Sequence, residues 1–409
     1  MDKPKIRFQG FEEAWCEKTL GEIAEFFDYG LNVSAKKYDG INKYLRITDI
    51  DETSRLFVLD NIASPNTDIR KVENYKLRDQ DIVFARTGAS VGKTYIYNVI
   101  DGDVYFAGFL IRARIPLKYS AQFVFQKTLT EDYKKFVAST SQRSGQPGIN
   151  ANEYSAYKCF TPSLPEQEKI GKLFQRIDHL LNLQQRKCDK LKDIKKSMLT
   201  KMFPKPGKKV PEVRFEGFTD DWVECKLGEI AEIKTGYPFS SQEFSPNGKY
   251  LVITNGNIQD SSSYVDGAIG NRITINNQQI LNEYILNTND ILVTMDGSVG
   301  RTAKVKDSCQ ILAQRVGRVI PKRDKEFIYQ LLNNGSFSES MENLAHGGTI
   351  KHISLSEISS YKNLISRNLS EQQKIGKLFE RLDHLISLNE LRLDKLRLLK
   401  RSFLEGMFV

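Results

Sequence analysis

The chain repeats itself, and this repetition constrains its fold more than any other feature. The segment IRFQGFEEAW at residues 6–15 returns as VRFEGFTDDW at 213–222, and LGEIAE at residue 20 returns at residue 227. Residues 166–185 and 371–390 are identical at 13 of 20 positions, with an offset of 205. A solenoid has repeats of roughly 20–50 residues. A single repeat of this length therefore indicates duplicated domains.

The two copies agree at their ends and differ in their middles. YGLNVSAKKYDGINKY and TGYPFSSQEFSPNGKY occupy the same place and share little beyond their last two residues. DIVFA and DILVT read as buried strands that each precede a Gly-rich turn, and the remaining segments read as strands and short helices. A chain of 409 residues is long enough for two domains. We expect an α+β chain with domains at residues 1–163 and 206–369, each followed by a conserved spacer helix, at residues 164–205 and 370–409.

A long amphipathic helix is predicted at the end of each copy. Its apolar residues recur at the a and d positions of a seven-residue repeat, which is typical of a coiled-coil seam. Two equivalent helices that pack about a twofold axis perpendicular to them run antiparallel, and this pairing would bring the polar interruptions Gln184 and Asn389 together. The predicted seam contains Ile170, Leu173, Ile177, Leu180, Gln184, Leu191 and Ile194 in the first copy, and Ile375, Leu378, Leu382, Leu385, Asn389, Leu396 and Leu399 in the second.

Several motifs of nucleotide, metal and methyl-donor sites can be tested against the sequence, and they fail. GASVGKT at residues 88–94 has three residues between its first Gly and the Gly-Lys pair, where a phosphate-binding loop has four. None of the four histidines has metal-site spacing. Neither GxGxxG nor Asn-Pro-Pro-aromatic occurs. We therefore expect no active site, metal or cofactor in this chain.

Composition favours a cytoplasmic protein. The five cysteines are odd in number and form no CxxC pair, so neither a disulfide framework nor a zinc knuckle is expected. Apolar stretches such as YFAGFLI are too short to cross a bilayer. The formal net charge of +9 is compatible with a nucleic-acid partner without establishing one.

These features together resemble the specificity subunits of type I restriction–modification systems. The resemblance covers essentially the whole chain and rests on the RFxGF…W…LGEIAE openings, the DI(V/L)…G.SVG cores and the EQxKIGKLF helices. It implies two target-recognition domains that each read half of a split double-stranded DNA sequence, with antiparallel helices that set the gap. It also implies that the helices dock two methyltransferase subunits, which carry S-adenosylmethionine. Restriction subunits, where two of them are present, would use ATP and Mg.

The motifs of this family do not identify base-reading residues, so candidates follow from side-chain chemistry. Arg and Lys suit guanine, Asn and Gln suit adenine, and Lys also suits phosphate. The same residue types are ordinary in surface loops. The DNA-binding candidates from polar loops and Gly-rich turns are Lys36, Lys37, Arg86, Lys93, Arg143 and Gln146 in the first domain, and Asn255, Asn257, Arg272, Arg301, Lys351 and His352 in the second.

Two other functions stay open at this stage. A coiled-coil scaffold that joins two protein-binding modules would show no salt-dependent DNA binding, whereas a DNA-reading protein loses affinity steeply as salt rises. An autonomous DNA-modifying enzyme would be active as the purified chain alone.

Overall fold

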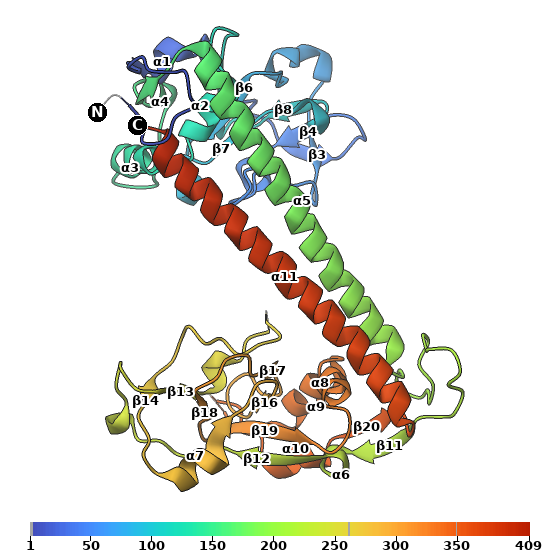
Figure 1. Cartoon of the computed structure of the whole chain (residues 1–409). Coiled ribbons are helices and arrows are strands. Elements are labelled where there is room, and N and C mark those ends of the chain that lie inside the picture. The colour runs from blue at the N-terminus through green and yellow to red at the C-terminus, as the bar shows by residue number, and fades with distance from the viewer. Residues whose placement is uncertain (1–2, 261, 349) are drawn as a thin grey trace. The chain divides into compact units, whose positions relative to one another are not determined.

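The computed structural model describes residues 3–260, 262–348 and 350–409 and divides into two compact units (Figure 1). The first unit comprises Met1–Arg186 and Glu390–Val409, and the second comprises Lys187–Asn389. Each unit contains one duplicated domain, with part of helix α5 (Leu164–Met202) and part of helix α11 (Leu369–Met407). The prediction of an α+β chain, with two duplicated domains each followed by a long helix, is confirmed.

A four-stranded antiparallel sheet forms the centre of the first domain, in the order β2-β9-β6-β7. Its strand β6 (Asp81–Ala85) is buried at every position because both of its faces are covered. Ile82 and Phe84 pack in one core, and Val83 and Ala85 pack in another, as the alternation of side chains along a strand requires. The other strands of this sheet are β2 (Phe26–Tyr29), β7 (Thr94–Ile96) and β9 (Leu110–Arg114).

Pairs of strands and short helices complete the first domain. The parallel pair consists of β4 (Lys43–Leu45) and β8 (Val104–Phe106). The antiparallel pairs are β1 (Cys16–Thr19) with β10 (Lys158–Thr161), and β3 (Ala35–Lys37) with β5 (Ala63–Pro65). The helices are α1 (Leu20–Ile23), α2 (Ala121–Lys127), α3 (Glu131–Thr140) and α4 (Ala151–Ser155).

The second domain repeats this plan. Its central sheet has the order β12-β19-β16-β17, and a second sheet, β14-β13-β18-β15, contains the parallel pair of β13 and β18. The strands are β11 (Val223–Lys226), β12 (Ala231–Thr235), β13 (Tyr250–Ile253), β14 (Arg272–Ile273), β15 (Ile285–Leu286), β16 (Ile291–Thr294), β17 (Thr302–Lys304), β18 (Gln310–Leu312), β19 (Val316–Pro321) and β20 (Lys362–Ile365). The helices are α6 (Leu227–Ile230), α7 (Gln278–Tyr284), α8 (Lys325–Leu332), α9 (Ser336–Leu344) and α10 (Leu355–Ser360).

The parts of α5 and α11 within the first unit run in opposite directions. The ammonium of Lys400 lies 2.7 Å from a carboxylate oxygen of Asp178. Arg397 donates a hydrogen bond of 3.0 Å to the side chain of Gln185. Residue numbers on α11 therefore fall as those on α5 rise.

The second unit shows the same order. Lys195 on α5 lies 2.6 Å from the carboxylate of Asp383 on α11. Eight residues after Lys195, the ring of Phe203 lies 6.4 Å from that of Phe379. The two ion pairs are equivalent in the repeat, because Lys400 and Asp383 each follow their counterpart by 205 residues.

The predicted seam residues differ in their burial. Ile170 and Ile177 lie in the core of the first domain, and Ile375 lies in that of the second. Each helix therefore packs the beginning of its apolar stripe against the domain that precedes it. Leu180, Ile194, Leu385 and Leu399 are 50, 39, 45 and 43 % exposed, respectively. The coiled coil, and the meeting of Gln184 with Asn389, stay predictions.

Each domain core is completed by the end of the other copy's helix. Phe408 follows α11 and packs in the first domain, with its ring 5.2 Å from Phe123 and 6.5 Å from Trp15. Phe203 follows α5 and packs in the second domain, with its ring 5.8 Å from Trp222. The Met-Phe pair that ends both helices is thus a core element.

Candidate nucleic-acid interface

Each unit brings a Gly-rich turn against a later loop through equivalent backbone hydrogen bonds. In the first unit, Gly88 N donates to Pro147 O and Ile149 N donates to Arg86 O, both at 2.9 Å. In the second unit, Gly297 N donates to Lys351 O and Ile353 N donates to Met295 O, again at 2.9 Å. We call this pair of segments the loop platform: residues 86–93 and 142–150 in the first unit, and residues 295–301 and 345–353 in the second, without the undescribed residue 349.

Three first-domain candidates lie on its loop platform. The guanidinium of Arg86 stacks over the ring of Tyr29, with its carbon 4.9 Å from the ring centre. Gln146 is exposed, and its amide nitrogen lies 2.9 Å from where a Cβ on Gly88 would stand. Arg143 is exposed and donates hydrogen bonds to Thr140 O and to the carboxylate of Glu153, which hold it against the protein.

Lys93 and Arg301 occupy equivalent positions at the ends of the two turns, and each is paired with an acid. Lys93 lies 2.6 Å from Glu52, and Arg301 lies 2.6 Å from Asp260. Lys93 is also 8 % exposed and donates to Ile50 O. Both side chains therefore connect a turn to the segment that follows the first strand of the parallel pair, β4 or β13. Whether either contacts DNA stays a prediction.

Lys351 and His352 lie on the loop platform of the second domain. Both are exposed, and the loop closes on itself because His346 and His352 exchange two backbone hydrogen bonds, at 2.8 and 3.0 Å. The Nδ1 atom of His352 lies 2.5 Å from Oδ1 of Asp296. Arg315 contacts the other oxygen of Asp296 at 2.9 Å.

Three second-domain candidates hold backbone segments in place. The side chain of Asn257 is buried, and the residue is 1 % exposed. Its Nδ2 donates to Asp266 O and Ile269 O, and its Oδ1 accepts two hydrogen bonds from Thr254. The amide oxygen of Asn255 accepts from Met295 N at 3.1 Å.

Arg272 donates to the carbonyl oxygens of Gly248 and Lys249, at 2.7 and 2.9 Å. The remaining candidates, Lys36 and Lys37, are exposed on β3, away from the platform segments in the sequence and in another strand pair.

Sequence reasoning missed four residues beside these platforms, which are Tyr29, Phe109, Asp296 and Arg315. Asp296 stands within DGSVG, so aligning the two Gly-rich turns would have drawn attention to it. Phe109 and Arg315 occupy the same place in the repeat, each following the parallel strand, and each is 63 % exposed. The sequence carries no signal for that exposure.

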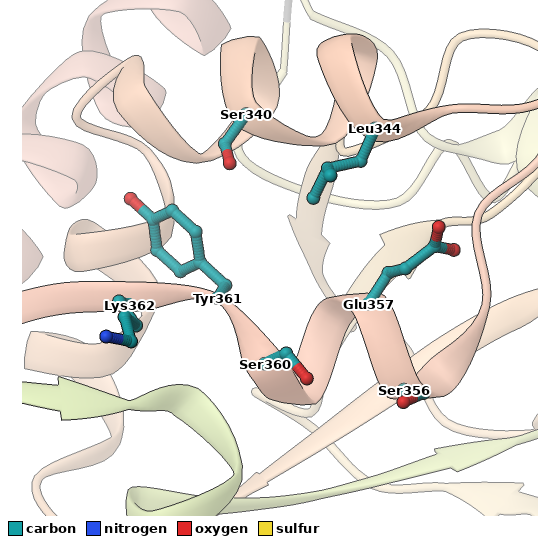
Figure 2. A pocket seen from close by; sticks show the side chains of 7 residues that line it. All are labelled: Ser340, Leu344, Ser356, Glu357, Ser360, Tyr361 and Lys362. Atoms are coloured by element: carbon teal, nitrogen blue, oxygen red, sulfur yellow. The ribbon is translucent and has the colours of Figure 1, made fainter.

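The units also contain cavities, and one in the first unit borders the first loop platform at residues 89–93. One of about 350 Å³ in the second unit is lined by Ser340 of α9, Glu357 of α10 and Tyr361, which follows α10 (Figure 2). One of about 1190 Å³ in the first unit is lined by residues of both charge signs, such as Lys134, Arg401, Glu131 and Asp132. Within the described residues, no group of three or more His, Cys, Asp or Glu side chains could hold a metal ion. No helix formed by these residues is long and apolar enough to cross a membrane.

Comparison with known proteins identifies the duplicated domains. The family model described as type I restriction modification DNA specificity domain matches twice, at residues 12–193 and 219–398. The chain belongs to this family. The type I restriction enzyme MjaVIII specificity subunit of Methanocaldococcus jannaschii is 24 % identical over 371 residues, which span 85 % of this chain and 82 % of that protein.

The same fold occurs in a solved structure. The S subunit of the type I restriction-modification system from M. genitalium aligns over 100 % of this chain and 99 % of its own length. The TM-score is 0.69 at 15 % sequence identity. The sequence-based identification of this chain as a type I specificity subunit, a DNA-binding protein with two repeated recognition domains, is confirmed.

Proposed function

We propose that each domain of this specificity subunit reads one half of a split DNA target, and that the loop platforms carry the readers. The supporting observation is a constant framework with exchanged side chains. Equivalent backbone hydrogen bonds hold both platforms, yet the first presents Arg86, Arg143 and Gln146, whereas the second presents Lys351 and His352. Because bases are distinguished by side-chain contacts in the major groove, two platforms of one shape and different chemistry suit two different half-sites.

The two long helices serve as the spacer between the half-sites in this proposal. Half-sites one helical turn apart on DNA are separated by roughly 34 Å. A helix of 39 residues, the length of both α5 and α11, spans about 58 Å at ~1.5 Å per residue. A rigid helix fixes the gap between half-sites, whereas a flexible linker would not.

Equivalent leucines on the helices support docking of two methyltransferase subunits. Leu180 on α5 and Leu385 on α11 are 50 and 45 % exposed. Leu183 and Leu388, one turn further along each helix, are 49 and 39 % exposed. Exposed apolar patches mark protein interaction sites, and a patch that occurs once in each repeat suits two copies of one partner.

The chemistry would then reside in the partners. Methylating an adenine requires taking the base out of the stack. A methyltransferase subunit with S-adenosylmethionine would do this beside each domain, while ATP and Mg would belong to restriction subunits. This chain would act without a cofactor and without catalytic residues of its own.

Mapping methylated adenines across the genome tests the proposal. Cells with this chain and its methyltransferase should methylate a split motif that disappears when the chain is removed. An unchanged motif in cells without the chain would overturn the proposal. Salt-dependent binding of DNA by the complex distinguishes it from a scaffold, and methylation or cleavage by the purified chain alone would favour an autonomous enzyme.

Docking on the helices has its own test. The double variant Leu183→Asp with Leu388→Asp should stop the methyltransferase from co-purifying with the chain, because both equivalent faces become charged. The control Leu117→Asp alters a leucine of the first domain that is 80 % exposed, and it should leave co-purification unchanged. If the double variant keeps the partner bound as tightly as the control does, the helices are not the docking faces.

A further inference from the structure

The turn between β18 and β19 presents an arginine on an unusual backbone. Gln314 and Arg315 are both exposed at this turn. The backbone of Arg315 has a φ angle of 69°, in a region that residues other than glycine rarely occupy. Its N–H donates to Thr235 Oγ1 at 3.3 Å, and the N–H of Gln314 donates to Tyr237 O at 2.9 Å. Strained backbone of this kind persists where the surroundings enforce it, and it concentrates at functional sites.

Asp296 holds the guanidinium of Arg315 in place. Its Oδ2 accepts from NH1 of Arg315 at 2.9 Å, and its Oδ1 contacts Nδ1 of His352. The carboxylate is 17 % exposed, whereas the arginine side chain is 63 % exposed. Partial burial raises the pKa of Asp296, but the hydrogen bonds and charges of Arg315 and His352 outweigh it and lower the pKa below its ordinary value. An ionised acid thus anchors one nitrogen of an exposed arginine.

The remaining donors of Arg315 point to its role. Among the described residues, its guanidinium has a hydrogen-bond partner only at NH1, so Nε and NH2 can still donate. A guanidinium edge with two parallel donors matches O6 and N7 of guanine, the commonest specific contact in the major groove. We propose that Arg315 reads a guanine in the half-site bound by the second domain, and that Asp296 is its positioning residue. This rests on the proposed function, since it requires that the second domain reads DNA.

The first domain supports a reading position here, because the same place carries different chemistry. Strand register makes Phe109 the counterpart of Arg315: Phe84 pairs with Ile111, and the equivalent Val293 pairs with Gly317. Phe109 is also 63 % exposed, and a phenylalanine offers no bidentate contact to guanine. The guanine contact is therefore specific to the second half of the target.

Methylation mapping with variants of Arg315 tests the inference. The chain would be produced with its methyltransferase partner, and methylated adenines would be sequenced across the genome. Arg315→Lys keeps the charge but loses the planar fork, so one guanine of the second half-motif should become degenerate while the first half-motif stays unchanged. Asp296→Asn keeps Arg315 but weakens its anchor. It should retain the motif while lowering the preference for that guanine severalfold.

The controls separate this inference from the function on which it rests. Arg323→Ala removes another exposed arginine of the second domain and should leave both half-motifs intact. If cells with the unsubstituted chain and its methyltransferase methylate no split motif, the proposed function is overturned. A split motif that persists unaltered in Arg315→Lys and Arg315→Ala would overturn the inference alone. So would a uniform fall in methylation at every site, because that result identifies a phosphate contact. Thermal unfolding checks that each variant folds, and Arg315→Lys decides if Arg315→Ala does not fold.

Discussion

Arg7 donates two hydrogen bonds to the carboxylate of Glu166, at 2.7 and 2.8 Å, and the glutamate side chain is 1 % exposed. The same arrangement recurs in the second unit, where Arg214 donates to Glu371 at 2.6 and 2.9 Å. Each pair ties the opening RF segment of a domain to the first turn of its long helix. Within each unit, the repeated RF opening therefore contacts the repeated start of the long helix.

Removing this arginine should destabilise one unit at a time. Arg7→Ala leaves the Glu166 carboxylate buried and unpaired, which costs about 3–5 kcal/mol. Urea unfolding followed by hydrogen exchange should show faster exchange in the first domain for Arg7→Ala, and in the second domain for Arg214→Ala. Lys5→Ala, at an exposed neighbour, should have almost no effect. Equal loss of protection in both domains would contradict the assignment of each pair to its own unit.

Truncating the aromatic residue at the end of either helix should weaken the domain built from the other copy. Phe408→Ala removes a ring that contacts Phe123, Trp15 and Phe174, and a buried Phe→Ala substitution costs about 3–5 kcal/mol. Exchange should then rise in the first domain, although Phe408 lies at the far end of the sequence. Ile100→Ala, at a side chain that is 88 % exposed, is the control. A rise confined to the second domain would contradict the packing.

The long-range order of the chain could be predicted from its sequence because duplication constrains contacts at every scale. Two domains, two long helices and their antiparallel order follow from one repeat. The heptad stripe constrains the fold less, since its periodicity shows that a face is apolar without showing what covers it. Ile170 and Ile375 are covered by their own domains. A residue of a coiled-coil seam and a residue of a domain core give the same apolar pattern in the sequence.

The candidate readers could be predicted by residue type but not by environment. Asn257 is a polar loop residue in the sequence, yet its amide is fully used in holding Thr254, Asp266 and Ile269. Arg315 follows an apolar strand and carries no local signal in the sequence, although the fold exposes it beside Asp296. Which polar side chains remain free depends on tertiary hydrogen bonds, and those have no local sequence signature.

Two equivalent glycines should resist substitution because backbones touch there. A Cβ on Gly30 would lie 2.0 Å from the carbonyl oxygen of Ala107, and one on Gly236 would lie 2.3 Å from that of Ala313. Gly30→Ala and Gly236→Ala should each lower the free energy of unfolding by about 1–3 kcal/mol, as overpacking does. Gly145→Ala is the matched control, since no atom lies within 4 Å of its Cβ position. Chemical denaturation measures all three, and a neutral Gly30→Ala would show that the strands can separate.

Asp39 should make the first domain sensitive to acid. Asp39 is exposed. Its limited desolvation raises the pKa, but hydrogen bonds from Asn42, Ile41 and Ser64 outweigh this effect and lower the pKa from 3.8 to about 2. A lowered pKa means that the carboxylate stabilises the fold fully above pH 3.8, and that this contribution is lost as the pH falls through about 2. Asp39→Ala should therefore be less stable at pH 7, and its unfolding free energy should fall less between pH 4 and pH 2. Denaturant titrations at several pH values measure this, with the exposed Asp60→Ala as control. An unchanged pH dependence of the unfolding free energy in Asp39→Ala would contradict this role of Asp39.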